Sequence, residues 1–277
     1  MVYHRDTHAI EHKIFRDVID YLRAGDVLVV NRTRVLPARS YAHTEHGGAV
    51  EVLLLKRRAL DEWEVLVRPG RKCRPGTHLV VNEELALDVL SVTDSGERIV
   101  RFAYEGAFED ILSRAGTMPL PPYIHEKLSD PERYQTVYSR ENGSAAAPTA
   151  GLHFTPELLE RIRAKGVEIA EVLLHVGLGT FRPVKEENVL DHKMHSEYYE
   201  VSEEAADIVN RAKREGRRIV CVGTTSVRTV ETVADENGLL HPCRGNTEIF
   251  IYPPNRFRCV HALNTNYQMP ERTLMMH

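Results

Sequence analysis

The chain has 277 residues, of which 42% are hydrophobic and 27% charged, and its formal net charge is −4 at pH 7. This composition is typical of a globular protein with room for two domains and a large core, and it excludes disordered and fibrous classes. The negative net charge also excludes a protein that coats nucleic acid through bulk charge, so any nucleic-acid contact must be local.

The apolar runs, the N-terminus and the cysteines indicate the cellular compartment and the state of the thiols. No apolar run approaches the roughly 18 to 20 residues that a membrane span needs, and no signal-peptide pattern is present, so we expect a cytoplasmic protein without a membrane contact. The cysteines form no CxxC pair, which favours reduced, unligated thiols over a zinc ribbon or a disulfide framework. They are Cys73, Cys221, Cys243 and Cys259.

The first elements predict the start of an α/β sheet. Apolar residues three and four apart predict a helix over residues 10–22. The continuous apolar run at 27–30 then predicts a strand buried on both faces. Asn31 begins a polar loop at the carboxyl end of this strand, a position that suits ligand contacts in an α/β sheet.

The next stretch changes to short β-prone runs separated by glycine-containing turns, which predict a small barrel or sandwich. A short helix is expected over 108–115. Because helix-rich sequence flanks this region on both sides, we expect a β-barrel domain of residues 39–115 inserted into a main domain of residues 1–38 and 116–277. The β-prone runs are 49–55, 63–67, 77–81, 85–92 and 98–102.

A helix and a strand follow, with a histidine at the loop on each side. Thr155 as N-cap and Pro156 at the first helical position predict a helix over 157–165, and a strand is expected over 167–174. His153 follows Gly151 before this unit, and His175 precedes Gly177 and Gly179 after it. Such loops carry ligand-binding groups, although a tight turn with packed or solvated histidines explains the glycines equally well.

The last third repeats the alternation of helix and strand. A capped helix is expected over 202–215, a strand over 219–222, and a second helix after the loop of Gly223, Thr224 and Thr225. A helix N-terminus with hydroxyls and free N–H groups can bind a carboxylate or phosphate. Residues 247–266 are expected to form a strand, a turn, a strand and a loop. The fold class is therefore α/β: a layered α/β/α main domain with an inserted small β-barrel.

Two cationic loops stand out from the acidic background. Four cations at 68–74 lie on Pro-Gly turns, and three arginines occur at 31–39. They are candidates for local contacts with nucleic acid phosphates, although such clusters are often only a solvated face.

Seven motifs together resemble one family. They are NRTRVLPAR at 31–39, PLPPYI at 119–124, YQTVY at 134–138, APTAGLHFT at 147–155, LHVGLGTFRPV at 174–184, HKMHSE at 192–197 and VGTTSVR at 222–228. In this order, and running nearly end to end, they resemble the S-adenosylmethionine:tRNA ribosyltransferase-isomerases of queuosine biosynthesis.

The resemblance implies a transfer of the ribosyl portion of S-adenosylmethionine to 7-aminomethyl-7-deazaguanine at the tRNA wobble position, with loss of adenine and methionine and formation of epoxyqueuosine. It implies an α/β main domain with an inserted barrel, S-adenosylmethionine as co-substrate and no metal. Gln268 and Pro254 depart from the family pattern. The chain also looks shortened at both ends, so we expect the fold to survive better than full activity.

The expected chemistry selects the candidate site residues. The sulfonium makes the C5′ hydrogens acidic, so the enzyme needs a base, donors for the departing adenine, and a partner for the methionine carboxylate. The candidate catalytic residues are His175 as first choice of base, His153 as its partner, and His195 and Glu197, with His192 as a further alternative. The candidate substrate-binding residues are Arg34, Thr149, Gly151, Gly177, Gly179, Thr180, Gly223, Thr224, Thr225 and Arg228. The candidate tRNA-binding residues are Arg39, Arg68, Arg71, Lys72 and Arg74.

Two other classes of function stay open. The histidines with Glu197 could ligate a transition metal in a hydrolase, although His192 and His195 lack the spacing of a zinc-binding helix. The chain could also be a catalytically silent tRNA-binding module, which would bind tRNA without releasing adenine.

Overall fold

The computed structural model describes residues 1–94, 96–120, 124, 128–177, 194 and 196–267. The chain divides into two compact units, which we call the main unit and the barrel unit. The main unit contains Met1–Arg34, Gln135–Glu141 and Ala147–His277, and the barrel unit contains Val35–Tyr134 and Asn142–Ala146. The expected boundaries of independently folding domains, 38/39 and 115/116, stay a prediction.

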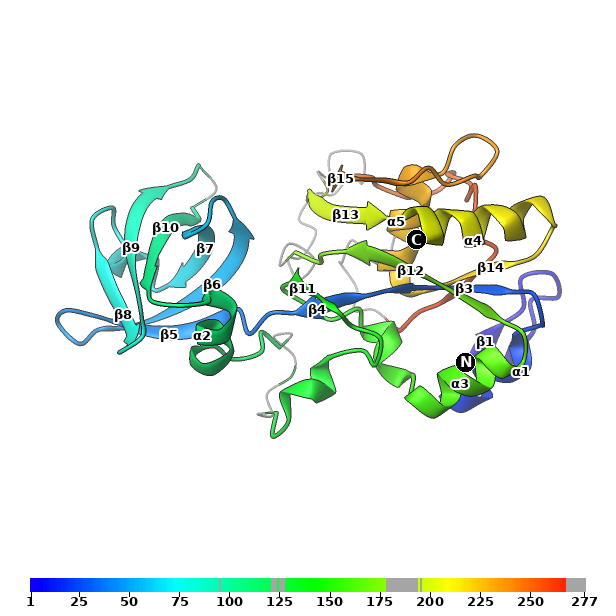
Figure 1. Cartoon of the computed structure of the whole chain (residues 1–277), viewed down its shortest axis with the longest axis horizontal. Helices are drawn as coiled ribbons and strands as arrows, with labels where there is room; N and C mark the ends of the chain where they lie inside the picture. Colours follow the sequence, from blue (N-terminus) through cyan, green and yellow to red (C-terminus); the bar gives the residue numbers. More distant parts are fainter. Residues whose placement is uncertain (95, 121–123, 125–127, 178–193, 195, 268–277) are drawn as a thin grey trace. The chain divides into compact units, whose positions relative to one another are not determined.

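The main unit is built on a six-stranded sheet with the order β15-β13-β12-β3-β14-β16 (Figure 1). Strands β12, β3, β14 and β16 run parallel, and β13 is antiparallel to both of its neighbours. β3 lies inside the sheet between β12 and β14, and all five of its residues are buried. Its apolar sequence predicts this burial. The bounds are β3 Val27–Asn31, β12 Glu168–Leu174, β13 Glu197–Val201, β14 Ile219–Val222, β15 Cys243–Thr247 and β16 Ala262–Asn264.

Helices cover both faces of this sheet, which confirms the layered α/β/α class. α4 (Glu203–Arg214) and α5 (Gly223–Val233) share a core with Val27 and Val29 of β3. α3 (Pro156–Ala164) shares a second core with Leu28 and Val30, whose side chains point to the opposite face. α1 (Val18–Tyr21) packs on the side of α3 (Figure 1).

Caps explain where the helices begin. The Thr155 hydroxyl accepts a hydrogen bond from the N–H of Leu158 at 3.2 Å, and Pro156 follows at the first helical position. The Ser202 hydroxyl accepts from the N–H of Ala205 at 3.2 Å before α4. These side chains satisfy N–H groups that the helix itself leaves unpaired, so the expected starts of both helices are confirmed.

The N-terminal segment differs from the expected helix over residues 10–22. The short strands β1 (Val2–Tyr3) and β2 (Ile10–Glu11) pair with each other, and a 3-10 turn, η1 (Phe15–Asp17), leads into the four-residue α1. Ile14 has an extended backbone and is 53% exposed, so it does not contribute to the apolar face. Of the residues expected to form this helix, only Val18–Tyr21 are α-helical.

The barrel unit contains a closed six-stranded barrel with the order β10-β7-β6-β5-β8-β9, which confirms the expected barrel (Figure 1). Its core includes Trp63 and the phenylalanines Phe102 and Phe108. The bounds are β5 Arg39–Thr44, β6 Ala49–Arg57, β7 Glu62–Arg68, β8 His78–Asn82, β9 Leu85–Val92, β10 Arg98–Tyr104 and α2 Phe108–Ala115.

The remaining described elements are short. β4 and β11 pair with each other, and no helix among the described residues is long and apolar enough to cross a membrane. The bounds are β4 Thr33–Val35, η2 Gly70–Lys72, η3 Pro131–Tyr134, β11 Glu141–Ser144 and η4 Thr149–His153.

The expected strand beginning at Thr247 is wrong, because β15 ends at that residue and residues 248–253 form no strand. β15 is a polar edge strand, and a mostly exposed strand shows no apolar periodicity. The apolar residues that suggested a strand, Ile249 and Ile251, pack into the core from irregular backbone instead.

Candidate active site

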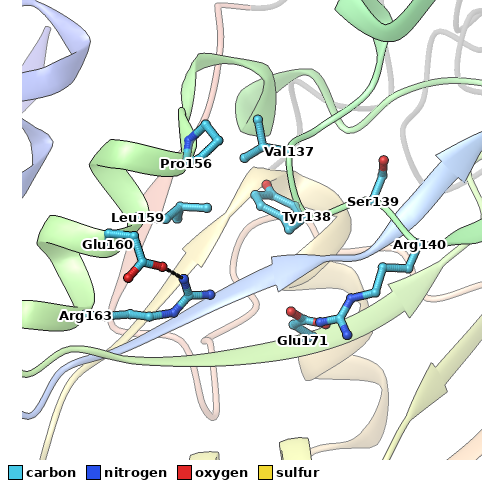
Figure 2. A pocket seen from close by; sticks show the side chains of 9 residues that line it. All are labelled: Val137, Tyr138, Ser139, Arg140, Pro156, Leu159, Glu160, Arg163 and Glu171. Atoms are coloured by element: carbon cyan, nitrogen blue, oxygen red, sulfur yellow. Dashed lines mark hydrogen bonds and ion pairs between the residues drawn. The ribbon is translucent and has the colours of Figure 1, made fainter.

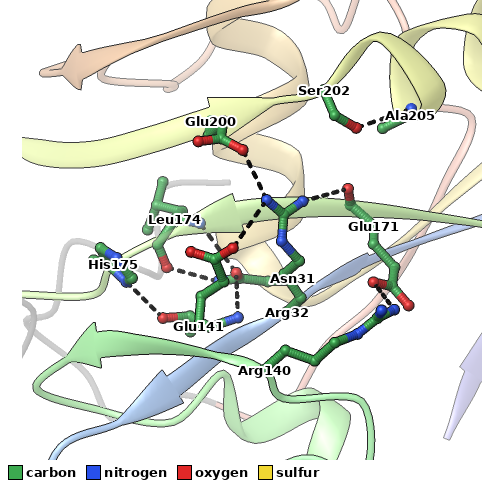
Figure 3. A network of polar contacts seen from close by, with 11 residues as sticks. Asn31, Arg32, Arg140, Glu141, Glu171, Leu174, His175, Glu200, Ser202 and Ala205 are labelled. Atoms are coloured by element: carbon green, nitrogen blue, oxygen red, sulfur yellow. Dashed lines mark hydrogen bonds and ion pairs between the residues drawn. The ribbon is translucent and has the colours of Figure 1, made fainter.

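The centre of the candidate site is the carboxyl end of β3, where Asn31 is fully buried. Its side-chain amide donates to the Leu174 carbonyl at 2.9 Å, and the Leu174 N–H donates to its Oδ1 at 3.0 Å (Figure 3). The parallel pairing of β3 with β12 ends at Val172 and Asn31. Beyond this pair, the Asn31 side chain supplies the hydrogen bonds to β12 in place of the backbone. Asn31 thereby fixes the backbone directly before His175.

His175 follows β12 and is held on three sides. Its N–H donates to the Tyr198 carbonyl at 2.9 Å, its ring stacks on the Tyr198 ring with centroids 5.7 Å apart, and its Nδ1 lies 2.8 Å from the Thr33 hydroxyl. Thr33 is fully buried. With Nδ1 engaged, Nε2 has no hydrogen-bond partner among the residues that the structure describes. The Thr33 contact therefore fixes the orientation of the His175 ring.

The surroundings of His175 favour its neutral form. Burial lowers the pKa of His175, and the charge of Arg32 adds to this, while Glu141 and Glu200 oppose it. Arg32 itself is held by Glu200 at 2.8 Å and by Glu141 at 3.6 Å (Figure 3). A neutral imidazole is the form that can accept a proton.

A buried ion pair supports the loop that begins after His175. The Arg228 guanidinium of α5 donates to Glu197 Oε2 at 2.6 Å and to the Thr247 carbonyl at 3.1 Å, and the Gly177 N–H donates to Glu197 Oε1 at 2.8 Å. The side chains of Glu197 and Arg228 are only 4% and 8% exposed. Burial lowers the pKa of Arg228, whereas Glu197 raises it. Arg228 thus joins β13 to β15, and Glu197 connects this pair to Gly177.

The expected loop of Gly223, Thr224 and Thr225 is wrong, because α5 begins at Gly223 directly after β14. This start of α5 lies beside η4. Gly223 has a φ of +81°, a conformation that favours glycine, and a Cβ built on it would lie 3.7 Å from the Cβ of Ala150. A Cβ on Gly151 would lie 2.1 Å from the Tyr138 hydroxyl oxygen, so only glycine fits there. The Thr225 hydroxyl is buried without a partner among the described residues. The structure therefore brings four expected substrate-binding residues, Gly151, Gly223 and their neighbours Thr149 and Thr224, to one place.

The two candidate histidines have separate partners. His153 is exposed, its Nε2 lies 2.8 Å from the Asn266 Oδ1, and its ring centroid lies 5.0 Å from that of Phe15. Asn266 follows β16, which is three strands away from β12 in the sheet. A direct pairing of His153 with His175 is therefore not among the contacts of the described residues.

Of the other expected site residues, the structure describes Arg34 and leaves four outside the described residues. Arg34 donates to the Ser139 hydroxyl at 3.1 Å and is partly buried. Gly179, Thr180, His192 and His195 lie outside the described residues. Sequence reasoning missed Thr33 and the pairing of Glu197 with Arg228. The sequence could have indicated Thr33, because it lies two residues after Asn31 at the end of a buried strand.

The barrel unit carries the expected tRNA-binding residues. Arg68, Arg71, Lys72 and Arg74 are all exposed, and none has an ion-pair partner among the described residues. Arg98 supports their loop from beneath, because its guanidinium donates to the Gly70 carbonyl at 2.8 Å and to the Cys73 carbonyl at 3.0 Å. Arg39 is instead engaged with Glu51 at 2.9 Å.

A pocket of about 350 Å³ opens beside α3 and β12 in the main unit (Figure 2). Arg163 pairs with Glu160 at 2.7 Å on one wall, and Arg140 pairs with Glu171 on the other. None of the expected site residues lines it. The full lining is Val137, Tyr138, Ser139, Arg140, Pro156, Leu159, Glu160, Arg163 and Glu171.

Comparison with known proteins decides the family. A model of the queuosine biosynthesis protein family matches residues 1–277. The chain belongs to this family. A Symbiobacterium thermophilum relative is 60% identical over 278 residues, which cover 100% of this chain and 82% of the relative. A Clostridioides difficile relative is 57% identical with the same coverage. Both are named S-adenosylmethionine:tRNA ribosyltransferase-isomerase.

A solved structure is also similar to this chain in sequence. The chain is 38% identical to the S-adenosylmethionine tRNA ribosyltransferase of Thermotoga maritima, with coverage of 99% of this chain and 78% of that one and a TM-score of 0.48. The family match confirms the resemblance that the seven motifs indicated, and with it the enzyme class of transferase-isomerases.

Proposed function

We propose that the chain transfers and isomerises the ribosyl portion of S-adenosylmethionine onto 7-aminomethyl-7-deazaguanine at the tRNA wobble position, with release of adenine and methionine and formation of epoxyqueuosine. The observation that carries the proposal is the match to the queuosine biosynthesis family over the whole chain, together with relatives named for this chemistry. S-adenosylmethionine is the co-substrate, and the proposal includes no metal. A tRNA substrate implies that the protein acts in the cytoplasm.

In this proposal His175 is the base. Its Nε2 takes a proton from C5′ of S-adenosylmethionine, and the adjacent sulfonium stabilises the carbanion that remains. The contact of Thr33 with Nδ1 supports this role because it orients the ring. Burial supports it as well, because the lowered pKa keeps the imidazole neutral near pH 7.

Other site residues take positioning and binding roles. The Glu197–Arg228 pair acts as a positioning pair, since Arg228 holds Glu197 and Glu197 accepts from the Gly177 N–H. Gly223, Thr224 and Thr225, at the start of α5, are proposed to hold the methionine carboxylate, because N–H groups and hydroxyls at a helix N-terminus attract anions. Gly151 and Thr149 are proposed to face the nucleoside. His153 and His195 stay further candidates for the acid that assists adenine departure.

The experiment replaces His175 with glutamine, which keeps a hydrogen-bonding group. We expect adenine release from S-adenosylmethionine in the presence of tRNA carrying the aminomethyl base to fall by roughly 100-fold or more, the usual effect of losing an acid–base group. Affinity for S-adenosylmethionine, measured by calorimetry, and the unfolding temperature should stay near those of the unaltered chain. Exchange of the C5′ hydrogens with deuterated solvent should fall in parallel.

His241→Gln is the matched control, because His241 is an exposed histidine paired with Asp235. A His175→Gln variant that unfolds easily yet releases adenine at the normal rate would make His175 structural. An unaltered chain that binds tRNA and releases no adenine would instead favour the catalytically silent module. The hydrolase alternative has lost its support, since relatives across the whole chain are named as transferases.

A further inference from the structure

The outer face of the barrel carries an aromatic ring that no packing explains. Tyr41 lies on β5 between the buried Ser40 and Ala42, and it is 57% exposed. His43, two residues further along, points to the same side and is also exposed. Strand propensity alone can place a tyrosine on a sheet surface, so the surroundings of the ring decide whether it has a binding role.

Cross-strand register places Tyr41 in one row with a cation. Tyr41 pairs with Glu51 on β6, and Glu51 pairs with Arg68 on β7. Directly paired residues on neighbouring strands point to the same face, and the strands lie about 5 Å apart, so Arg68 is about 10 Å from Tyr41 across the sheet. The carboxylate between them is engaged with Arg39 at 2.9 Å.

The loop 68–74 places a further cation at the rim of the barrel, on the side of the turn that Thr44 faces and Tyr41 does not. A Cβ built on Gly48, in the turn between β5 and β6, would lie 2.9 Å from the Lys72 Nζ, so the ammonium group sits beside this turn. His43 is the exposed residue of β5 nearest to the turn, because it pairs with Ala49. Arg98 holds the loop in place through its bonds to the Gly70 and Cys73 carbonyls. The loop is therefore fixed directly after Arg68, the cation that shares the face of Tyr41.

We infer that this face, formed by Tyr41, His43 and Arg68, binds an unpaired stretch of RNA, with one base stacked on the Tyr41 ring and an adjoining phosphate on Arg68. An exposed aromatic ring next to cations is the combination that single-stranded nucleic acid requires, because each base has a stacking face and each link carries a negative charge. The inference deepens the tRNA contact of the proposed function by naming a base-stacking residue.

The test compares two substitutions of Tyr41. Tyr41→Val keeps the preference for a strand but removes the stacking face, whereas Tyr41→Phe keeps the ring. The full chain is titrated, by fluorescence anisotropy, into a labelled single-stranded RNA of about eight nucleotides, within the site sizes of such surfaces. We expect Tyr41→Val to weaken binding by about tenfold and Tyr41→Phe to leave it within about twofold.

Salt dependence separates stacking from charge. Tyr41→Val should leave the slope of log affinity against log salt unchanged, whereas Arg68→Gln should reduce it by about 0.7, the value for one phosphate contact with a single strand. Affinity for a duplex RNA of the same sequence should not change in Tyr41→Val, because paired bases are not free to stack on the ring. Tyr3→Val, a change at another exposed tyrosine, is the control and should match the unaltered chain.

Several outcomes overturn the inference. Unchanged single-strand affinity in Tyr41→Val would do so, as would an equal loss with duplex RNA. The emission of Trp63, buried in the barrel, checks that the variants are folded. If Tyr41→Val binds RNA normally while adenine release still depends on His175, the inference fails and the proposed function stands. If Tyr41 is required for RNA binding but no adenine is released, the inference stands and the proposed function fails.

Discussion

Replacing Glu197 with glutamine should destabilise the main unit far more than the loss of an exposed charge. The Glu197 side chain is 4% exposed, and its two oxygens accept from Arg228 and from the Gly177 N–H. Glutamine fits the same space and can still accept the Gly177 hydrogen bond. The change therefore isolates the loss of the counter-charge that is hydrogen-bonded to the buried Arg228 guanidinium.

The size of this effect follows from the burial of both partners. Removing one member of a buried ion pair costs about 3–5 kcal/mol, a large part of the roughly 5–15 kcal/mol that stabilises a typical domain. The matched control is Glu160→Gln. Glu160 pairs with Arg163 one helical turn away on the exposed face of α3, where such a pair contributes only about 0.3–0.5 kcal/mol. The two substitutions make the same chemical change in different surroundings.

Denaturant unfolding followed by two probes provides the assay. Far-UV circular dichroism reports on the helices, and α3, α4 and α5 pack on the sheet of the main unit. The fluorescence of Trp63 reports on the barrel. We expect Glu197→Gln to lower the midpoint by circular dichroism well below that of Glu160→Gln. The double change of Glu197→Gln with Arg228→Met should recover part of the loss, because it removes the uncompensated charge.

Equal midpoints for Glu197→Gln and Glu160→Gln would refute this reasoning. The burial of the pair would then not set its energy, and the proposed positioning role of Glu197 would lose its physical basis. A double variant less stable than Glu197→Gln alone would show that packing around the Arg228 side chain, and not its charge, accounts for the loss.

Two more predictions concern pH and charge. Because burial lowers the pKa of His175, the unfolded chain binds a proton that the folded chain does not between that lowered value and about 6.5. Stability should therefore fall as pH drops through this window, and His175→Gln should flatten that part of a plot of unfolding free energy against pH; a plot of unchanged shape would contradict the assignment. Changing Arg68, Arg71, Lys72 and Arg74 together to glutamine should reduce the salt slope of tRNA binding by about 3 while leaving S-adenosylmethionine affinity unchanged, and an unaltered slope would exclude these four as phosphate contacts.

Elements with a local cause could be predicted from the sequence. The buried run of β3 and the caps at Thr155 and Ser202 each act within a few residues, and they form as expected. The barrel could also be predicted, because its alternating strands and glycine turns repeat at short spacing. The family resemblance added the chemistry, which no local pattern contains.

The parts that could not be predicted depend on distant residues. β15 has the polar sequence of an exposed edge, so only its pairing with β13 defines it as a strand. The Glu197–Arg228 pair joins residues 31 positions apart, and neither residue signals in the sequence that it will be buried. The separation of His153 from His175 follows from the strand order, which sequence adjacency to glycine does not reveal.

Residues 174–177 carry the proposed base, and three side chains from different elements hold them. Asn31 at the end of β3 binds both backbone groups of Leu174, Thr33 binds the His175 ring, and Glu197 of β13 binds the Gly177 N–H. All three side chains are buried, and placing polar groups there costs free energy that apolar residues would not. The buried backbone groups of Leu174 need the partners that Asn31 supplies, but a packed strand end does not need a side chain that holds the His175 ring. A proton-transferring group does, because it works only when held within about 0.5 Å of its productive position. The contact of the buried Thr33 with the His175 ring is therefore the one that supports the proposed role of His175 most directly.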